Sequence, residues 1–519
     1  MERPILNHFY NYEEICAYIE AAQKAHPDVM QVTSLAKTEG GRDIWCITLC
    51  KGGNPDDKPA FYVQGGIHAQ EGMGITCSLN FLWTVLEKNP EILDNQTVYI
   101  LPCVNPDGSN LCVTTGVEVR SKLERIPGLE NAVIPQDLDG DGKILFMRWE
   151  DPNGYYVDLP ECGNMLVHRR AGDKGPFYSQ ITEGVVENYN GGSLQRGVRN
   201  LDFNRQYGVG WVDNPNGGDF PGNHIEPRTI MKFMSTHPNI YVIMDVHCGT
   251  RALIYATPSN IADARLFKKL AMTCQEMTGI EAITHSDYAR PEGYPASNLR
   301  GHIDDYTYDA LGIPAVTVEL GNGYNSLGMK SRDVFNADLY ERELISQIVA
   351  MHAAKDRTIA SPWKKINHPQ LGEIEVGGLD YHGAYFMDPD DMLELLPKVA
   401  DYFMQVSKWV PILEFTDVTC EAMGGDVYRI RAGVINNGQL NTRVLYGPSS
   451  YHANKDMVKF LVEGNVEILS GDISPKIRSL EPLDTASAEW FVRAKSGDRI
   501  TVKAVFPKAV NAELTVVAP

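Results

Sequence analysis

Three features are absent from this 519-residue sequence, and each absence narrows the class of protein. No apolar run approaches the roughly 18 residues that span a bilayer, so we do not expect an integral membrane protein. The first residues lack a basic stretch followed by an apolar one, which argues against a signal peptide, although a chain with its leader removed would begin in the same way. The ten cysteines form no CxxC pair and several lie in apolar runs, as reduced core thiols do, which favours the cytoplasm.

Basic residues are also in the minority. The chain has 47 Lys+Arg against 67 Asp+Glu, a formal net charge of -20, and such a charge repels phosphate backbones. We therefore expect no nucleic-acid partner, and the simplest role of the charge is solubility. The 43% hydrophobic and 22% charged content is that of a globular protein, and the length corresponds to roughly two to four domains. No pattern in the sequence indicates an oligomeric state.

Over residues 1–360, short apolar runs alternate with longer helical patterns. Helical spacing covers Glu71–Lys88, Glu226–His237, Ala262–Thr278 and Ala337–Lys355. The strand-like runs are MQVTSLA, DIWCITLC, AFYVQGGIH, TVYILPCVN, IYVIMDVHC, ALIYATP and AVTVELG. This alternation predicts an α/β domain with a mostly buried sheet.

Three other regions depart from this pattern. Residues 109–199 are rich in Gly, Pro, Asp and Asn and predict a long insertion of loops. Residues 361–411 form a bridging region with one helical pattern, Pro389–Val410. Over residues 412–519, segments such as YRIRAGVINNG and DRITVKAVF alternate apolar and polar residues with a period of two, and turn signals separate several of them. This pattern predicts a small all-β sandwich domain.

His68 and Glu71 lie where the run AFYVQGGIH meets a predicted helix. Sites in open α/β sheets form at this position, outside the carboxyl ends of the strands. His247, at the end of IYVIMDVHC, offers a third ligand, and two His with one Glu are the composition of a catalytic zinc site. An HxxE pair alone is explained by chance, but Glu319 at the end of AVTVELG adds a fourth strand-end residue. Beside a metal-activated water, Glu319 would take a proton and deliver it to a leaving amine.

These residues belong to a longer series of motifs. In order, they are GRDIW (41–45), GGIHAQE (65–71), NPDG (105–108), LDFNRQYG (201–208), DVHCGT (245–250), YPAS (294–297) and DDYTYDALGIPAVTVEL (304–320). Over roughly the first 360 residues the sequence resembles the zinc metallocarboxypeptidases of the carboxypeptidase A and B type. The resemblance implies a mixed central sheet flanked by helices, one Zn²⁺ per chain and a peptide substrate with a free carboxylate.

The resemblance also implies roles for single residues. It assigns zinc binding to His68, Glu71 and His247, and it makes Glu319 the general base for the zinc-activated water. The family's D-x-N-R motif corresponds here to Asp202, Asn204 and Arg205. Its Asp orients the first zinc His, and its Asn and Arg grip the terminal carboxylate of the substrate, which a guanidinium fork matches.

Three further assignments rest on spacing within the resemblance. An arginine that stabilises the oxyanion follows NPDG by about a dozen residues in the family, which gives Arg120, with Arg148 as the alternative. Tyr294 matches the tyrosine that closes over the substrate. Asp304 matches the acid that pairs with Lys or Arg side chains in the B type. Alternatively, Asp304 caps the helix that begins near Asp305.

Two departures from the family pattern concern upstream peptide recognition. Gln70 stands where the family commonly has an arginine that binds substrate upstream of the scissile bond. The insertion over 109–199 is far longer than in the digestive enzymes and could reshape the entrance to the cleft.

A second ion site is indicated inside the insertion. The segment DLDGDGKI places Asp137, Asp139 and Asp141 at alternate positions before Gly142, like the start of a calcium loop. Position 12, usually Glu, is Arg148. A solvated acidic turn is the alternative to a structural Ca²⁺.

The leading hypothesis is a zinc-dependent carboxypeptidase that removes single C-terminal residues, with a preference for Lys or Arg if Asp304 lies in the pocket. The alternative keeps the fold and the zinc but hydrolyses an isopeptide, γ-glutamyl or N-acyl amino-acid bond. A non-catalytic binding protein is disfavoured, because no ligand is lost and Glu319 is retained.

Overall fold

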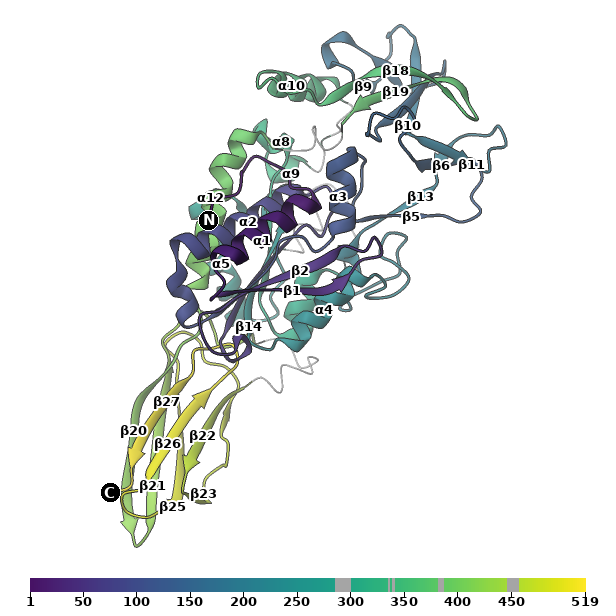
Figure 1. Ribbon diagram of the computed structural model, residues 1–519. Helices are drawn as coiled ribbons and strands as arrows, with labels where there is room; N and C mark the ends of the chain where they lie inside the picture. The colour runs from purple at the N-terminus through teal and green to yellow at the C-terminus, as the bar shows by residue number, and fades with distance from the viewer. Residues whose placement is uncertain (285–299, 335–336, 338–340, 381–386, 446–456) are drawn as a thin grey trace.

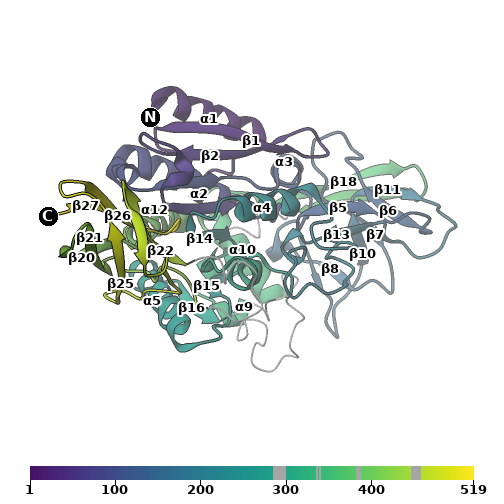
Figure 2. The ribbon, with the colours of Figure 1, turned by 90° about the horizontal axis from the view of Figure 1, so that it is seen from below.

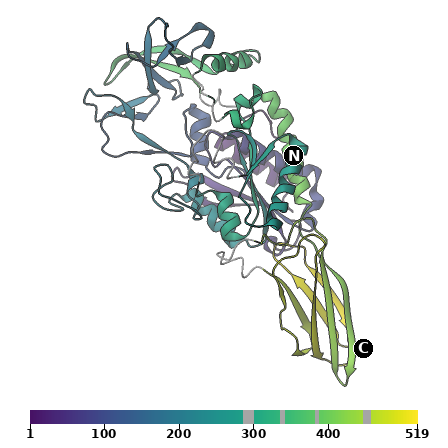
Figure 3. The ribbon, with the colours of Figure 1, turned by 180° about the vertical axis from the view of Figure 1, so that it is seen from behind.

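A computed structural model of the chain describes residues 1–284, 300–334, 337, 341–380, 387–445 and 457–519. Figure 1 shows three parts in a row: an α/β unit in the middle, a smaller lobe rich in β-strands at one end and a β-sandwich at the other. The lobe and the sandwich also lie at opposite ends in the views of Figures 2 and 3. No helix in the described residues is long and apolar enough to cross a membrane.

Eight strands form the central sheet, in the order β1-β2-β4-β3-β14-β17-β15-β16. They are β1 (Met30–Lys37), β2 (Asp43–Leu49), β3 (Ala60–Gly65), β4 (Thr97–Leu101), β14 (Ile240–His247), β15 (Arg251–Tyr255), β16 (Glu281–Thr284) and β17 (Ala315–Leu320). The pairs β3–β4, β3–β14 and β14–β17 are parallel, whereas β1–β2 and β15–β17 are antiparallel. The mixed sheet is confirmed, and all seven strand-like runs lie in it; β16 adds to that set.

Helices cover both faces of this sheet. Because side chains alternate along a strand, Phe61 and Val63 pack with helices α1, α2, α5 and α12, whereas Ala60 and Tyr62 pack with α4 on the other face. The helices are α1 (Tyr12–Ala25), α2 (Gly72–Lys88), α3 (Pro106–Thr115), α4 (Ile225–Thr236), α5 (Ile261–Thr278), α7 (Ile303–Tyr306), α8 (Gly323–Ser326), α9 (Ser331–Val334), α10 (Arg342–Ala353) and α12 (Pro389–Ser407).

The predicted insertion over residues 109–199 is not made of loops alone, because nine short strands begin in it. They are β5 (Lys122–Arg125), β6 (Ala132–Pro135), β7 (Phe146–Glu150), β8 (Tyr156–Asp158), β9 (Leu166–His168), β10 (Phe177–Thr182), β11 (Gly184–Glu187), β12 (Gln195–Arg196) and β13 (Val198–Leu201). Strands of two to six residues leave little periodic signal between Gly- and Pro-rich turns, and the pairing that stabilises them is not local.

Residues 361–411 do not form a separate bridge either. Strands β18 (Ala360–His368) and β19 (Gly372–Leu379) complete a six-stranded sheet of the order β18-β19-β7-β10-β8-β9. Helix α12 instead packs on α2 and α5 of the central unit. Helix α10 packs against the lobe, with Ile345 and Ile348 in one apolar cluster with Val157 and Val167. The lobe is therefore built from two segments distant in sequence.

The C-terminal sandwich is confirmed. Two four-stranded antiparallel sheets, in the orders β20-β21-β25-β23 and β24-β22-β26-β27, enclose an apolar core that includes Trp490 and Phe460. The strands are β20 (Leu413–Gly424), β21 (Val427–Asn436), β22 (Val458–Gly464), β23 (Glu467–Ser470), β24 (Lys476–Ile477), β25 (Thr485–Arg493), β26 (Arg499–Val505) and β27 (Ala512–Val517).

Candidate metal centre and active site

Three neighbouring strands bring the predicted metal ligands together. Strand β14 pairs in parallel with β3 on one side and with β17 on the other, and His247 is the register partner of Glu319. His68 follows the end of β3 by three residues. Because the carboxyl ends of parallel strands meet at the same edge of a sheet, residues 179 positions apart become neighbours.

The turn from β3 into α2 depends on small residues. A Cβ on Gly65 would lie 2.5 Å from the Gly74 carbonyl oxygen of α2, and Gly66 has a φ of +69°. Glycine alone meets both conditions without strain. The tight turn carries His68 and the N-cap residue Glu71 directly over the sheet edge.

Four potential ligand atoms converge between His68, Glu71 and His247. The two Nδ1 atoms of the histidines are 3.1 Å apart. His68 Nδ1 lies 2.8 Å from Glu71 Oε1, and His247 Nδ1 lies 2.9 Å from Glu71 Oε2. The three residues are 2%, 1% and 1% exposed, respectively. One buried point is thus surrounded by two imidazoles and a carboxylate.

Each imidazole is oriented by a second carboxylate. His68 Nε2 lies 3.0 Å from Asp202 Oδ1, and His247 Nε2 lies 2.8 Å from Asp245 Oδ2. A ring that donates its Nε2–H to a carboxylate presents the Nδ1 lone pair to the shared point. Asp202 was assigned from its motif, whereas Asp245 was missed. The available signal is its position two residues before His247, which puts both side chains on one face of β14.

The electrostatics of the cluster favour a bound cation. Burial opposes the charged form of Glu71, but the charges of His68 and His247 hold the pKa of its carboxyl well below the usual range. Burial also opposes a charged His247, yet Asp245 and Glu71 raise the pKa of the ring well above its usual value. A proton or a metal ion relieves the same negative potential.

The donor set fits zinc. Zinc takes imidazole nitrogen and carboxylate oxygen, and a catalytic site keeps one position open for water or substrate. Here two nitrogens and one carboxylate are oriented by outer carboxylates and border a cavity that Glu319 also lines. Burial and the neighbouring Glu71 carboxylate raise the pKa of Glu319 to about 7.

The cavity beside the metal cluster also contains most of the predicted substrate-binding residues. Its walls include Arg120, Asn204, Arg205 and Asp304, together with His68, His247, Ile254, His302, Thr317 and Glu319. The cap of α7 is His302, and Asp304 is 1% exposed and faces this cavity. The structure therefore favours the pocket position of Asp304 over the helix-cap alternative.

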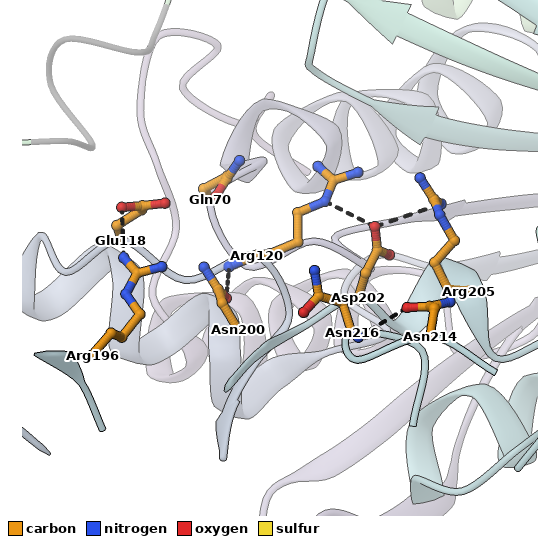
Figure 4. A pocket seen from close by; sticks show the side chains of 9 residues that line it. All are labelled: Gln70, Glu118, Arg120, Arg196, Asn200, Asp202, Arg205, Asn214 and Asn216. Carbon is orange, nitrogen blue, oxygen red and sulfur yellow. Dashed lines mark hydrogen bonds and ion pairs between the residues drawn. The ribbon is translucent and has the colours of Figure 1, made fainter. Parts of the chain in front are cut away.

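Arg120 and Arg205 share one carboxylate. Arg120 Nε lies 3.2 Å from Asp202 Oδ2, and Arg205 Nη1 lies 3.5 Å from the same oxygen, so that Asp202 stands between the two guanidinium groups (Figure 4). Arg120 Nη1 also donates to Glu71 Oε1 over 2.9 Å. Burial opposes the charge on Asp202, but Arg205 and Arg120 hold its pKa well below the usual range.

The alternative oxyanion residue, Arg148, lies elsewhere. It sits in β7 of the lobe, pairs with Asp158 and Glu375, and is stacked between the rings of Tyr178 and Trp363 at 4.2 Å from each centroid. Arg148 is thus part of the lobe's core, and Arg120 is the arginine beside the metal cluster. Tyr294 lies outside the described residues.

The predicted calcium loop has a different composition from the one expected. Asp137 and Asp139 come together with Glu183, which the sequence pattern did not indicate, and Asp141 is not part of this group. Both carboxylate oxygens of Asp137 accept loop N–H groups, and Asp139 pairs with Lys364 over 3.0 Å.

A mixed α/β sheet with a His-Glu-His cluster at its carboxyl edge has the composition and location of a catalytic zinc site. Residues 15–139 and 144–336 match the zinc carboxypeptidase family, which is more than half of the chain. The chain therefore belongs to the zinc carboxypeptidase family. Residues 412–517 match a domain of unknown function.

Individual relatives cover shorter stretches. The chain is 31% identical over 103 residues to carboxypeptidase B of Astacus astacus, which is 19% of this chain and 33% of that protein. It is 33% identical over 107 residues to zinc carboxypeptidase A 1 of Drosophila melanogaster, which is 19% of this chain and 25% of that protein. The matches thus span a quarter to a third of these relatives. The solved structure of carboxypeptidase A of Helicoverpa armigera is 18% identical in sequence, with a TM-score of 0.40. The superposition covers 68% of this chain and 75% of that chain.

Proposed function

We propose that this protein is a zinc-dependent carboxypeptidase that hydrolyses the C-terminal peptide bond and prefers Lys or Arg at the terminus. One observation carries the proposal. A single small cavity is lined by the His68 and His247 imidazoles, the Glu319 carboxylate, the Arg205 guanidinium and the Asp304 carboxylate. These groups match the reacting bond, the terminal carboxylate and a basic side chain of one substrate.

Asn204 and Arg205 bind the terminal carboxylate in this proposal. The Asn204 side-chain oxygen accepts the Ile303 N–H over 3.0 Å, so its NH₂ group is the end that can donate to a substrate. Arg205 adds a planar fork that matches a carboxylate. Both residues follow Asp202 in one short 3₁₀ turn. Asp202, which orients His68, therefore also fixes the position of the carboxylate-binding pair.

Three groups act on the scissile bond. A zinc ion held by His68, Glu71 and His247 supplies Lewis acidity, which polarises a carbonyl group and lowers the pKa of water. Glu319, with its pKa near 7, accepts the proton of the attacking water and returns it to the amine that leaves when the C–N bond breaks. Arg120 presents a guanidinium to the developing oxyanion.

Asp304 provides the side-chain preference. A buried carboxylate that lines the cavity favours a cationic side chain, because a positive charge beside it gains a strong electrostatic attraction that an apolar side chain cannot offer. An isopeptide, γ-glutamyl or N-acyl amino-acid substrate with a free carboxylate would use the same anchor, so the test includes such compounds.

The test is mass spectrometry of peptides that differ only in the last residue, after incubation with the zinc-loaded protein. We expect loss of single C-terminal residues, fastest for Lys and Arg, and no cleavage of the matching C-terminal amides, which lack the carboxylate for Arg205. Intact peptides together with hydrolysis of a γ-glutamyl or N-acyl compound would replace this proposal with the specialised amide hydrolase. The Glu319→Gln variant is the control for contaminating peptidases.

A further inference from the structure

A second cavity adjoins the metal cavity on its outer side. It measures about 500 Å³, and all nine side chains that line it are polar (Figure 4). Four of them are the amides of Gln70, Asn200, Asn214 and Asn216. Amide groups donate and accept hydrogen bonds, as the peptide backbone does, whereas an apolar side chain would find no apolar wall here.

This outer pocket and the metal cavity share two walls. Arg120 and Arg205 line both cavities, and Asp202 between them lines the outer one. In the proposed function, Arg205 holds the terminal carboxylate and Arg120 lies at the scissile carbonyl. The residues upstream of the scissile bond then extend past Arg120 into the outer pocket.

The charged side chains of the outer pocket form ion pairs. The pocket contains the three guanidinium groups of Arg120, Arg196 and Arg205 but only the two carboxylates of Glu118 and Asp202. Asp202 pairs with Arg120 and Arg205, and Glu118 pairs with Arg196 over 3.1 Å at the opposite end of the pocket (Figure 4). Glu71, which lies outside this lining, is a further partner of Arg120 over 2.9 Å, so three carboxylates balance the three arginines. The arginine without a role at the scissile bond or the terminal carboxylate is Arg196.

Arg196 is also open to a ligand. Its side chain is 43% exposed, and its partner Glu118 is 32% exposed, so the pair is a solvent-accessible one that a second carboxylate can enter. Arg196 belongs to β12 and Glu118 follows the end of α3, so this end of the pocket is supplied by the region between residues 109 and 199.

We propose that Arg196 makes the enzyme prefer an acidic side chain in the two residues upstream of the scissile bond. This inference rests on the proposed function, because that function sets the direction in which the peptide lies across the two cavities. The specificity is then two-sided, with a basic residue bound at Asp304 and acidic residues bound at Arg196. Glu118 competes with the substrate for Arg196 and moderates the preference.

The test compares two peptides of equal length that end in the residue the wild type releases fastest and carry either Glu-Glu or Gln-Gln before it. We expect kcat/KM to be about fivefold higher for the Glu-Glu peptide, as for an accessible charge-assisted contact, and the ratio to fall toward one at high salt. Arg196→Gln should remove the ratio and leave the Gln-Gln peptide unaffected. Glu118→Gln should increase the ratio.

Arg125→Gln is the matched control, because Arg125 is an exposed β5 arginine that pairs with Glu187 and does not line the pocket. A second readout is the ratio of the two dissociation constants, measured in the Glu319→Gln background. An unchanged Glu-to-Gln ratio in Arg196→Gln, with both peptides still cleaved, overturns this inference alone. If neither peptide is cleaved by the wild type, the proposed function fails and the inference fails with it.

Discussion

Two groups of side chains in this protein bring acidic residues within reach of one ion, and they are built in opposite ways. His68, Glu71 and His247 lie at the carboxyl ends of parallel strands, and each is at most 2% exposed. Asp137 and Asp139 lie on a half-buried loop beside the buried Glu183. In each group two members share one turn, but the third lies 179 residues from His68 in the first group and much closer along the chain in the second.

The difference lies in where the lone pairs point. Outer carboxylates orient His68 and His247 so that their Nδ1 atoms face each other, an arrangement that a cation stabilises. In the loop, the Glu183 oxygens accept the N–H groups of Leu138 and Leu145, and Asp137 accepts two others. The loop therefore satisfies its carboxylates with its own backbone. A count of acids does not define a metal site; the orientation of the donor atoms does.

The largest effect is expected from His247→Ala. This change removes one imidazole and leaves Glu71 and Asp245 buried without their cation, so both bound zinc and turnover should be lost. Metal analysis after dialysis, together with peptide hydrolysis, checks this. Wild-type zinc content in the variant would show that the strand-end cluster is not the metal site.

Glu319→Gln should separate metal binding from chemistry. The amide keeps the size of the side chain but cannot accept the proton, so kcat should fall by about 10²–10⁴ while zinc stays bound. Steady-state kinetics and metal content are measured on the same preparation. Turnover close to wild type with zinc present would remove Glu319 from the mechanism.

Asp245→Asn tests the orientation argument directly. The loss of the charge behind His247 should weaken zinc affinity by about 10–100-fold, the range found for such outer partners. Competition with a chelator measures this affinity. Asp139→Asn is the matched change in the loop, and an equal loss of zinc affinity there would contradict the distinction between the two groups.

Asp304→Ala should act on specificity without affecting the metal. The preference for Lys and Arg over apolar termini should fall by about tenfold or more, because the buried charge is gone. The measurement is kcat/KM for peptides that end in Arg and in Leu. An unchanged ratio of these two values would place the specificity elsewhere.

The smallest effect is expected from Asp139→Asn on activity. In its ion pair the Lys364 side chain is 60% exposed but the Asp139 side chain only 7%, so the change should cost about 1–2 kcal/mol of stability and leave turnover unchanged. The calcium-loop hypothesis adds that Ca²⁺ raises the melting temperature of the wild type but not of this variant. Equal melting temperatures with and without Ca²⁺ in the wild type would favour a solvated turn.

Seven of the eight strands of the central sheet could be predicted because each lies in a run of mainly apolar residues, whereas the short edge strand β16 has no such run. The run IYVIMDVH is buried on both faces along its whole length. The lobe could not be predicted in the same way. Arg148 on β7 pairs in register with Glu375 on β19, and neither short strand is stable or recognisable without the other.

The α/β unit, the sandwich and the candidate zinc ligands could be predicted from the sequence, because their signals are local: apolar period, strand ends and an HxxE pair. The packing of distant segments was needed to show that Arg120 rather than Arg148 adjoins the metal cluster, that Asp304 faces the cavity, and that Asp245 stands behind His247. Each of these depends on the direction of a side chain relative to a distant segment. The order of residues along the chain does not specify these directions. They are set when the sheet, the turn after β3 and the lobe pack together.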